Sequence, residues 1–248
     1  MPYESDTAAI YDLYFPPDRS PEADLWVRLA GPAATHLLEP MIGTGEVALL
    51  LASRGYHVTG VDLSLPMLEV CAKRREAAGP EVCQRLTLVQ GDISRVVLPL
   101  DHFDLAYVSH GSWHLLAERR LRMDALRAVR RSLRPGGKLA MELFPPLKSS
   151  GRSEPRSFRP FRPTPPELDV VKTSQLERDA EEQVMRIHEV LTVNGQVTEN
   201  HLLLQLLTPE QIRAELKRAG FSQVELYGNF DLEPYSEGAP MILTVATV

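Results

Sequence analysis

The sequence predicts an α/β fold in which helices cover both faces of a doubly wound, mostly parallel sheet. Between residues 36 and 144, short apolar segments alternate with amphipathic ones, and only short turns separate them. Repeated strand–helix units of this kind build parallel sheets. The chain has 248 residues, of which 44% are hydrophobic, enough for one large domain or for one domain with a subdomain.

The repeating units are expected at defined positions. Ser64 can cap the helix that follows it, and Pro66 fits the first turn of that helix. Ser20, Pro21 and Glu22 form another helix start, within a first segment (1–35) that reads as helical and aromatic. The expected strands up to residue 144 are 35–41, 56–63, 86–92, 103–110 and 138–144, and the expected helices are 45–55, 64–79 and 118–137, the last closed by glycine.

The composition changes at residue 145. Residues 145–168 are rich in Pro, Arg and Ser, and we expect a long loop without regular structure. Asn194-Gly195 then lies between two strand-like segments, which is the strongest short hairpin signal in the sequence. The chain ends with an expected helix at 208–220 and two expected strands at 221–230 and 241–248.

Charge and composition limit the classes of function. The net charge of -6 provides no basic field that would attract DNA or RNA, so we expect no nucleic-acid partner. We find no signal peptide and no apolar stretch that approaches a membrane span, and we expect a cytoplasmic protein. Cys71 and Cys83 lack metal-ligand spacing and are expected to be reduced thiols, and no acid cluster indicates a metal site.

The glycine turn after the first strand allows two interpretations. Gly43-x-Gly45-x-x-Ala48 fits the dinucleotide fingerprint, and Asp62 lies where a ribose-binding acid is expected. This pattern alone is compatible with NAD. However, Glu39 would put a negative charge near a pyrophosphate, whereas a ligand that carries an ammonium and a sulfonium tolerates this acid.

Two further features favour the second type of ligand. The third strand ends in Gly91-Asp92-Ile93, where the carboxylate can accept from an adenine amino group and the Ile93 N–H can donate to the ring. A dehydrogenase of this length usually has a Tyr-x-x-x-Lys pair or another catalytic device after the fourth or fifth strand. We find no such pair there.

In the order and spacing of these motifs, the chain resembles class I S-adenosylmethionine-dependent methyltransferases. Glu39 to Gly45 corresponds to their first motif, in which Met41 replaces the first glycine, and residues 133–137 correspond to the motif before the fifth strand. The resemblance implies a Rossmann-like methyltransferase sheet with an antiparallel last strand and a small antiparallel β insert. The cofactor-binding residues that it implies are Tyr11, Glu39, Met41, Gly43, Gly45, Asp62, Leu63, Met67, Asp92, Ile93 and Ser109.

The methyl acceptor is expected near the end of the fourth strand, because open α/β sheets bind ligands at the carboxyl ends of their strands. His110 and His114 are candidates to take a proton from the acceptor or to orient it, and Trp113 is a candidate contact. Either histidine could instead cap a helix or pack against Trp113. The motifs of amino-adenine and cytosine C5 methyltransferases are absent, which favours a small-molecule acceptor.

Within the class, the chain resembles small-molecule N-methyltransferases that act on glycine-type amines and on nucleotide-linked amino sugars. In these enzymes an N-terminal helix with Tyr-Asp-x-x-Tyr folds over the cofactor, which implies roles for Tyr11 and for Tyr14 as a catalytic residue. The alternative for both is hydrophobic anchoring of the helix. The resemblance implies an N-terminal lid (1–35), a cofactor-binding core (36–144 and 206–248) and an insert (145–205) that serves as a lid or for homodimerisation.

The insert also carries an excess of basic residues. Arginine binds phosphates and carboxylates, so Arg159 and Arg162 are candidates to hold an anionic acceptor, although a solvated loop would show the same composition. The main hypothesis is N-methylation of an amine. The alternatives are a small-molecule O-methyltransferase, an NAD(P)-dependent oxidoreductase and a non-catalytic cofactor-binding protein.

Overall fold

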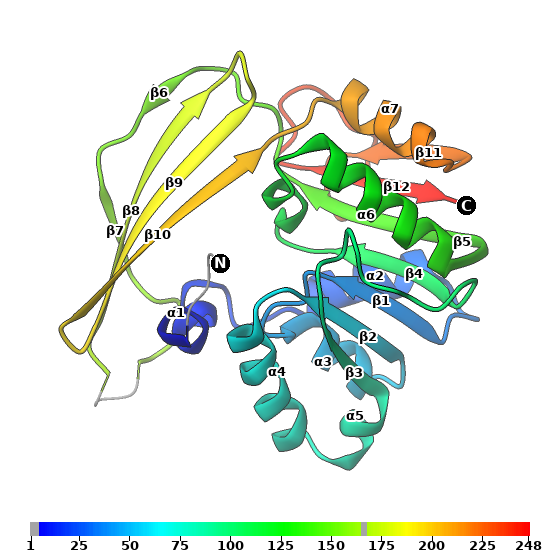
Figure 1. Ribbon diagram of the computed structural model, residues 1–248, viewed down its shortest axis with the longest axis horizontal. Helices are drawn as coiled ribbons and strands as arrows, with labels where there is room; N and C mark the ends of the chain where they lie inside the picture. Colours follow the sequence, from blue (N-terminus) through cyan, green and yellow to red (C-terminus); the bar gives the residue numbers. More distant parts are fainter. Residues whose placement is uncertain (1–4, 165–167) are drawn as a thin grey trace.

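The computed structural model describes residues 5–164 and 168–248, and its central element is a seven-stranded sheet (Figure 1). The strand order is β3-β2-β1-β4-β5-β12-β11, and all strands run parallel except β12, which is antiparallel to both of its neighbours. The predicted fold class is therefore confirmed. The strands of this sheet are β1 (His36–Pro40), β2 (His57–Asp62), β3 (Leu86–Gln90), β4 (Phe103–Val108), β5 (Leu133–Leu143), β11 (Gln223–Tyr227) and β12 (Ile242–Thr247).

Helices cover both faces of this sheet. Successive strand residues point to opposite faces, so Leu37 and Leu105 pack into one hydrophobic cluster and Leu38 and Ala106 into the other. The first cluster contains side chains of the helices α2 (Ser20–Ala30), α3 (Glu46–Ser53), α4 (Leu65–Ala77) and α5 (Pro80–Arg85). The second contains side chains of α6 (Arg119–Ser132) and α7 (Pro209–Ala219), which lie side by side in Figure 1.

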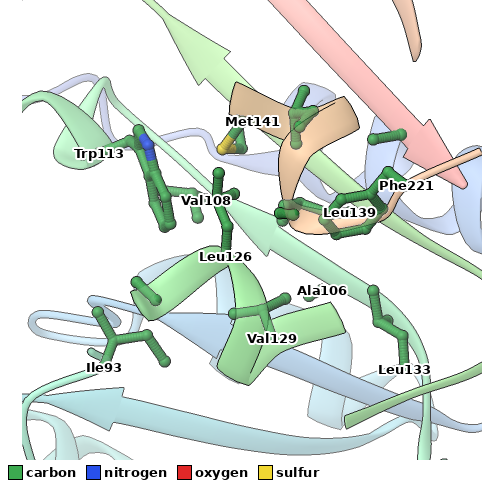
Figure 2. Packing of buried hydrophobic residues seen from close by; sticks show 14 of the residues in the cluster. Ile93, Ala106, Val108, Trp113, Leu126, Val129, Leu133, Leu139, Met141 and Phe221 are labelled. Atoms are coloured by element: carbon green, nitrogen blue, oxygen red, sulfur yellow. The ribbon is translucent and has the colours of Figure 1, made fainter. Parts of the chain in front are cut away.

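The α6 side of the core is shown in Figure 2. Leu126 and Val129 of α6 pack against Ala106 of β4 and Leu139 of β5, and Trp113 closes the end of this cluster near the carboxyl ends of the strands. This packing holds the loops that follow β3 and β4, which contribute to the site described below.

The second sheet is antiparallel and is formed entirely by residues 151–205. Asn194 and Gly195 have φ values of 48° and 82°, the left-handed conformations that a tight hairpin requires, so this predicted hairpin is confirmed. In Figure 1 the edge strand β10 is the strand of this sheet nearest the core. Its strands are β6 (Gly151–Arg152), β7 (Arg156–Phe158), β8 (Val170–Asp179), β9 (Val184–Val193) and β10 (Gln196–Gln205).

Two predictions of secondary structure were wrong in part. Residues 145–168 are not entirely irregular, because β6 and β7 pair with β8. The strand β8 itself was not predicted, since it carries many polar side chains and its stability comes from the ladders on both sides more than from burial. The helix expected at 118–137 ends at Ser132, and its glycines belong to the irregular start of β5.

The N-terminal segment contains α1 (Ser5–Ile10) and a 3-10 helix at Tyr11–Tyr14 before α2. Residues 1–4 of the expected lid and 165–167 of the expected loop lie outside the described residues. The division into lid, core and insert stays a prediction. Among the residues that the structure describes, no helix combines the length and the apolar character needed to cross a membrane.

A buried ion pair joins the two helices on the α6 side of the sheet. Arg122 of α6 donates from Nε and Nη2 to the two carboxylate oxygens of Glu215 on α7, each at 3.0 Å, and both side chains are about 95% buried. Nη1 of Arg122 also donates to the carbonyl oxygens of Leu116 and Ala117, at 2.9 and 2.7 Å. The Arg122–Glu215 pair therefore connects the packing of α6 against α7 to the loop after β4.

We predict that Arg122→Ala lowers the free energy of unfolding by about 3–5 kcal/mol, because the buried Glu215 carboxylate loses both hydrogen bonds and keeps only the exposed Arg119, at 3.6 Å. The double variant Arg122→Met/Glu215→Leu is expected to regain part of this loss, since it leaves no buried charge, although the carbonyl oxygens of Leu116 and Ala117 still lose their donor. Urea unfolding of the purified proteins measures both effects. Arg127→Ala removes an exposed arginine of the same helix and is the control, and equal losses for Arg122→Ala and Arg127→Ala would contradict the prediction.

Candidate functional site

The turn between β1 and α3 opens toward a cavity. Met41, Gly43 and Gly45 all have positive φ values, of 61°, 56° and 76°. A Cβ on Gly45 would lie 2.3 Å from Sγ of Cys71, so only glycine fits there, whereas a Cβ on Gly43 would meet nothing within 4 Å. Met41 adopts the left-handed conformation without being glycine, at a cost of roughly 1–2 kcal/mol. The backbone at this turn can therefore be approached closely by a ligand.

Asp62, at the end of β2, fixes the position of the turn. Its Oδ2 accepts a hydrogen bond from the Gly43 N–H at 2.7 Å, and its Oδ1 accepts one from the Ser64 N–H at 2.8 Å. Burial raises the pKa of Asp62, and these backbone hydrogen bonds partly offset the rise. Ser64 caps α4 as predicted, accepting from the Met67 N–H.

Two adjoining cavities lie at the carboxyl ends of the strands, with volumes of about 600 and 50 Å³. Both are lined by Tyr11, Met41, Gly43 and Ser112, so they form one continuous site with a wide and a narrow end. The predicted cofactor residues at the wide end alone are Asp62, Leu63, Met67, Asp92 and Ile93, and those at the narrow end alone are Glu39 and Ser109. Of the predicted cofactor residues, only Gly45 lines neither cavity, and it shapes the turn from behind.

The acid of the third strand is held at the wide end. Oδ1 of Asp92 accepts hydrogen bonds from the backbone N–H and the hydroxyl of Ser94, at 2.9 and 2.7 Å. Its Oδ2 lies 3.8 Å from Nε of Arg95, beyond hydrogen-bond distance. One oxygen of this carboxylate can therefore accept a hydrogen bond from a ligand, beside the buried side chain of Ile93.

Glu39 is buried at the narrow end, and its burial favours the uncharged carboxyl group. The Tyr107 hydroxyl donates to its Oε2 at 2.8 Å. Burial raises the pKa of Glu39 to about 8, and the negative charge of Asp62 adds to the rise, whereas Tyr107 and Arg19 oppose it. A positive charge placed in the narrow end would favour ionisation of this carboxyl group.

Arg19 was not predicted as a site residue, yet its guanidinium lies in the narrow end. It forms an ion pair with Glu22 at 3.0 Å and donates to Nδ1 of His110 at 3.0 Å. The side chain is 6% exposed, and its Nε has no hydrogen-bond partner among the described residues. Since Arg19 immediately precedes α2, the sequence around it indicates only a helix start. The narrow end thus holds a buried carboxyl group and a buried cation.

His110 lines the narrow end, but both of its ring nitrogens are occupied. Because arginine can only donate, Nδ1 accepts from Arg19 and the proton is assigned to Nε2, which faces Glu22 at 3.4 Å. Burial, followed by the charge of Arg19, lowers the pKa of His110 to about 3. This histidine is a poor proton acceptor, contrary to the role expected for it.

His114 has a structural role. Its Nδ1 lies 2.8 Å from the carbonyl oxygen of Gln205 and donates to it, and its Nε2 accepts from the Phe144 N–H at 2.9 Å. The ring is fully buried, and burial lowers its pKa to about 4. His114 therefore ties the ends of β5 and β10 together, and we no longer assign it to acceptor handling.

The remaining candidate residues do not line the two cavities. Trp113 is buried in the hydrophobic core (Figure 2), and Arg159 is exposed. Arg162 forms an ion pair with Glu46 at 2.5 Å and donates to the Pro16 carbonyl oxygen. Tyr14 lies beside Lys172 in a separate small pocket, and its hydroxyl has no hydrogen-bond partner among the described residues.

One wall of the wide end was not predicted either. It is formed by residues 115–117 after β4, which belong to the expected core, and by residues 199–203 of β10, near the end of the expected insert. The side-chain amide of Asn200 donates to the Thr7 hydroxyl at 3.2 Å, so β10 also contacts α1. Only the pairing of the second sheet brings this strand to the cavity, which explains why local patterns did not indicate it.

Comparison with known proteins identifies the core. Residues 37–137 match the family model described as a methyltransferase domain. The cypemycin N-terminal methyltransferase of a Streptomyces species is 26% identical over 249 residues, which cover 98% of this chain and 96% of the relative. A ubiquinone/menaquinone biosynthesis C-methyltransferase of Paracoccus denitrificans is 37% identical, but the alignment covers only 44% of this chain and 42% of the relative. The chain spans about half the length of the first curated relatives that it matches.

Solved structures show the same fold over the whole chain. An S-adenosylmethionine-dependent methyltransferase from Clostridium acetobutylicum aligns with a TM-score of 0.79 and 16% identity, covering 98% of both chains. CalS10, an amino pentose methyltransferase from Micromonospora echinaspora, aligns with a TM-score of 0.72 and 23% identity, covering 99% of this chain and 97% of its own. The predicted resemblance to class I methyltransferases is confirmed.

The raised pKa of Glu39 predicts a specific dependence of stability on pH. The unfolded side chain loses its proton near pH 4.5, whereas the folded one keeps it up to about pH 8. Between these values the folded state binds the additional proton, so its stability falls as pH rises, by about 1.4 kcal/mol per pH unit at most. Glu39→Gln cannot ionise and should lose this contribution to the pH dependence, while its amide oxygen can still accept from Tyr107.

Urea unfolding at pH 5, 6.5 and 8, without added ligand, measures this difference. The difference in the free energy of unfolding, Glu39→Gln minus the unsubstituted protein, is expected to increase steadily from pH 5 to pH 8. Glu69→Gln, at an exposed position of α4, serves as the control and should follow the unsubstituted protein. If both variants have the same pH dependence, Glu39 is ionised in the folded protein and the assignment is wrong.

Proposed function

We propose that this chain, whose residues 37–137 form a methyltransferase domain, transfers the methyl group of S-adenosylmethionine to an amine nitrogen of a small molecule. The observation that carries the proposal is the pairing of a buried cation, Arg19, with a buried carboxyl group, Glu39, at the narrow end of a nucleoside-sized cavity. S-adenosylmethionine has a zwitterionic amino-acid end and an adenosine end, and the site has the complementary groups at its two ends.

Each group of the cofactor has a candidate partner. Arg19 would bind the carboxylate through Nε, which has no hydrogen-bond partner among the described residues and lies 3.8 Å from Oε2 of Glu46. Glu39 would bind the ammonium group and become ionised in doing so. Asp62 would accept from the ribose hydroxyls with its remaining lone pairs, and the free oxygen of Asp92 would accept from the adenine amino group. The backbone N–H of Ile93 would donate to the adenine ring.

The state of the two histidines supports an amine as the acceptor. A neutral amine attacks the sulfonium methyl group directly, and alignment of the two reactants supplies most of the acceleration. A hydroxyl group first needs a base. Since the ring nitrogens of His110 and His114 are occupied, neither histidine predicted for this role is suited to remove such a proton. The amino pentose and N-terminal methyltransferases among the similar proteins agree with this inference.

The wall of the wide end supports an acceptor with an apolar skeleton. Leu115, Leu116, Leu202 and Leu203 contribute to this wall. Arg159 and Arg162 do not line the cavity, so an anionic acceptor has no support from their positions. The matches to C-methyltransferases keep carbon as a second candidate acceptor atom, although they cover only 44% to 58% of the chain.

We predict that the protein binds S-adenosylmethionine and S-adenosylhomocysteine but neither NAD⁺ nor NADP⁺ in calorimetric titrations. Arg19→Met should weaken binding of both ligands roughly 10- to 100-fold, the loss of one hydrogen bond to a charged group. It should leave binding of 5′-methylthioadenosine unchanged, because this nucleoside has no carboxylate. Asp62→Ala should weaken binding of S-adenosylmethionine, S-adenosylhomocysteine and 5′-methylthioadenosine alike, because all three contain the ribose.

Comparison of 5′-methylthioadenosine with the two amino-acid-bearing ligands separates the loss of one contact from a folding defect. A variant that merely distorts the site would lose methylthioadenosine together with the two amino-acid-bearing ligands. Such a result for Arg19→Met would remove Arg19 from the cofactor site, and preferential binding of a nicotinamide dinucleotide would overturn the proposed function.

We predict that, of two compounds that share a skeleton but differ in a free amine, only the compound with the amine is methylated. Suitable pairs are an amino sugar with its parent sugar, and a short peptide with a free or an acetylated N-terminus. Mass spectrometry after incubation with methyl-labelled cofactor identifies the modified atom. The rate should rise with pH as the amine loses its proton, and label on a hydroxyl oxygen or on carbon would contradict the assignment.

A further inference from the structure

Three side chains of the hairpin β9–β10 with metal-binding groups lie on one face of the second sheet. His188 of β9 is directly opposite His201 of β10 in the ladder. Glu199 precedes His201 by two residues and therefore points to the same face. The pairing follows from the turn at Asn194-Gly195, since residues at equal distance on either side of a two-residue turn face each other.

The potential ligand atoms of these residues lie close to one another. Nε2 of His188 lies 3.0 Å from Oε2 of Glu199, and Nε2 of His201 lies 4.0 Å from the same oxygen. The two imidazole rings are parallel, with centroids 4.5 Å apart. One ligand atom from each residue lies within 4.8 Å of the other two. Ligand atoms around a tetrahedral zinc ion are roughly 3.3 Å apart, so small rotations of these exposed side chains would complete the geometry.

The charges nearby leave the carboxylate available. Within the described part of the chain, Glu199 forms ion pairs with no lysine or arginine, and its only partners are the two histidines. Arg186, on the same face of β9, is engaged with Glu177 at 3.1 Å. Two imidazoles and one carboxylate are a donor set that binds zinc and similar ions while keeping a fourth position open.

We propose that His188, Glu199 and His201 bind a divalent transition-metal ion at the rim of the wide cavity. The sequence indicated no metal site, because these residues come together only when the hairpin forms. His201 lines both the wide cavity and a neighbouring hollow of about 410 Å³, so the open position of the ion would be accessible to water or to an oxygen or nitrogen donor of a bound molecule. The ion would also tie β10 to β9 beside the cavity.

Zinc titration of the untagged, chelator-treated protein tests this proposal. We expect calorimetry to detect one zinc ion per chain and zinc to raise the melting temperature, since a ligand of the folded state stabilises it. His188→Ala, His201→Ala and Glu199→Gln should each weaken binding at least about tenfold, because loss of a direct ligand costs no less than loss of a supporting group. These side chains are exposed or half-buried, so the variants should fold.

His57→Ala is the matched control, because His57 also lies on a strand and stacks on another imidazole, that of His36. It should bind zinc like the unsubstituted protein. No zinc binding, or equal binding by the three cluster variants and the unsubstituted protein, would overturn the proposal. Binding of S-adenosylmethionine to the chelator-treated protein is measured in parallel, and it separates failure of the metal site from failure of the proposed function.

Discussion

The hydrogen bond from the Gly43 N–H to the Asp62 carboxylate, at 2.7 Å, fixes the position of the ligand site. It joins the turn after β1 to the end of β2, and the Ile42 N–H adds a second link by donating to the Val61 carbonyl oxygen. Parallel pairing brings the two strand ends to the same edge of the sheet, but it does not by itself determine the path of the turn. The carboxylate does so, and the wide cavity opens directly beside it.

The narrow end of the site shows how buried charges are compensated before a ligand arrives. A buried carboxylate and a buried guanidinium are each costly to remove from water. Glu39 avoids the cost by retaining its proton, whereas Arg19 is balanced by the carboxylate of Glu22. A zwitterion supplies both opposite charges at once, so it can bind without leaving either protein group uncompensated. Under the proposed function, this arrangement would favour ligands with two adjacent and opposite charges.

Local signals in the sequence were sufficient for the core and for the turn. Thr208 and Gln211 form the expected start of α7 with two reciprocal hydrogen bonds, and Asn194-Gly195 specifies the hairpin because both residues must adopt positive φ. The alternation of apolar segments predicted every strand of the main sheet, although the boundaries differ by a few residues. These features depend on neighbours in the sequence.

The features that were missed depend on contacts between distant segments. Arg19 becomes a site residue only because α2 packs against β4 and β5, and β10 reaches the cavity only through the second sheet. His114 illustrates the opposite error: an aromatic, polar segment at a strand end suggested chemistry, while the fold uses the ring to satisfy two backbone groups. The predicted turn at Asn194-Gly195 already implied the strand register that places His188 opposite His201, but neither strand alone indicates this pair.

The contacts of the N-terminal segment determine when the site can form during synthesis of the chain. Thr7 accepts from Asn200, and the Leu13 carbonyl oxygen accepts from the Phe161 N–H, so each contact joins residues separated by roughly 150 to 190 positions. Contacts of such long range form late, because the intervening chain must first be made and ordered. Residues 36–143, which supply five of the strands of the main sheet, are synthesised first, whereas the wall formed by β10 and its contact with α1 must wait until residue 200 has emerged. A nascent chain interrupted before that point would have the turn after β1 but would lack the β10 wall of the wide cavity.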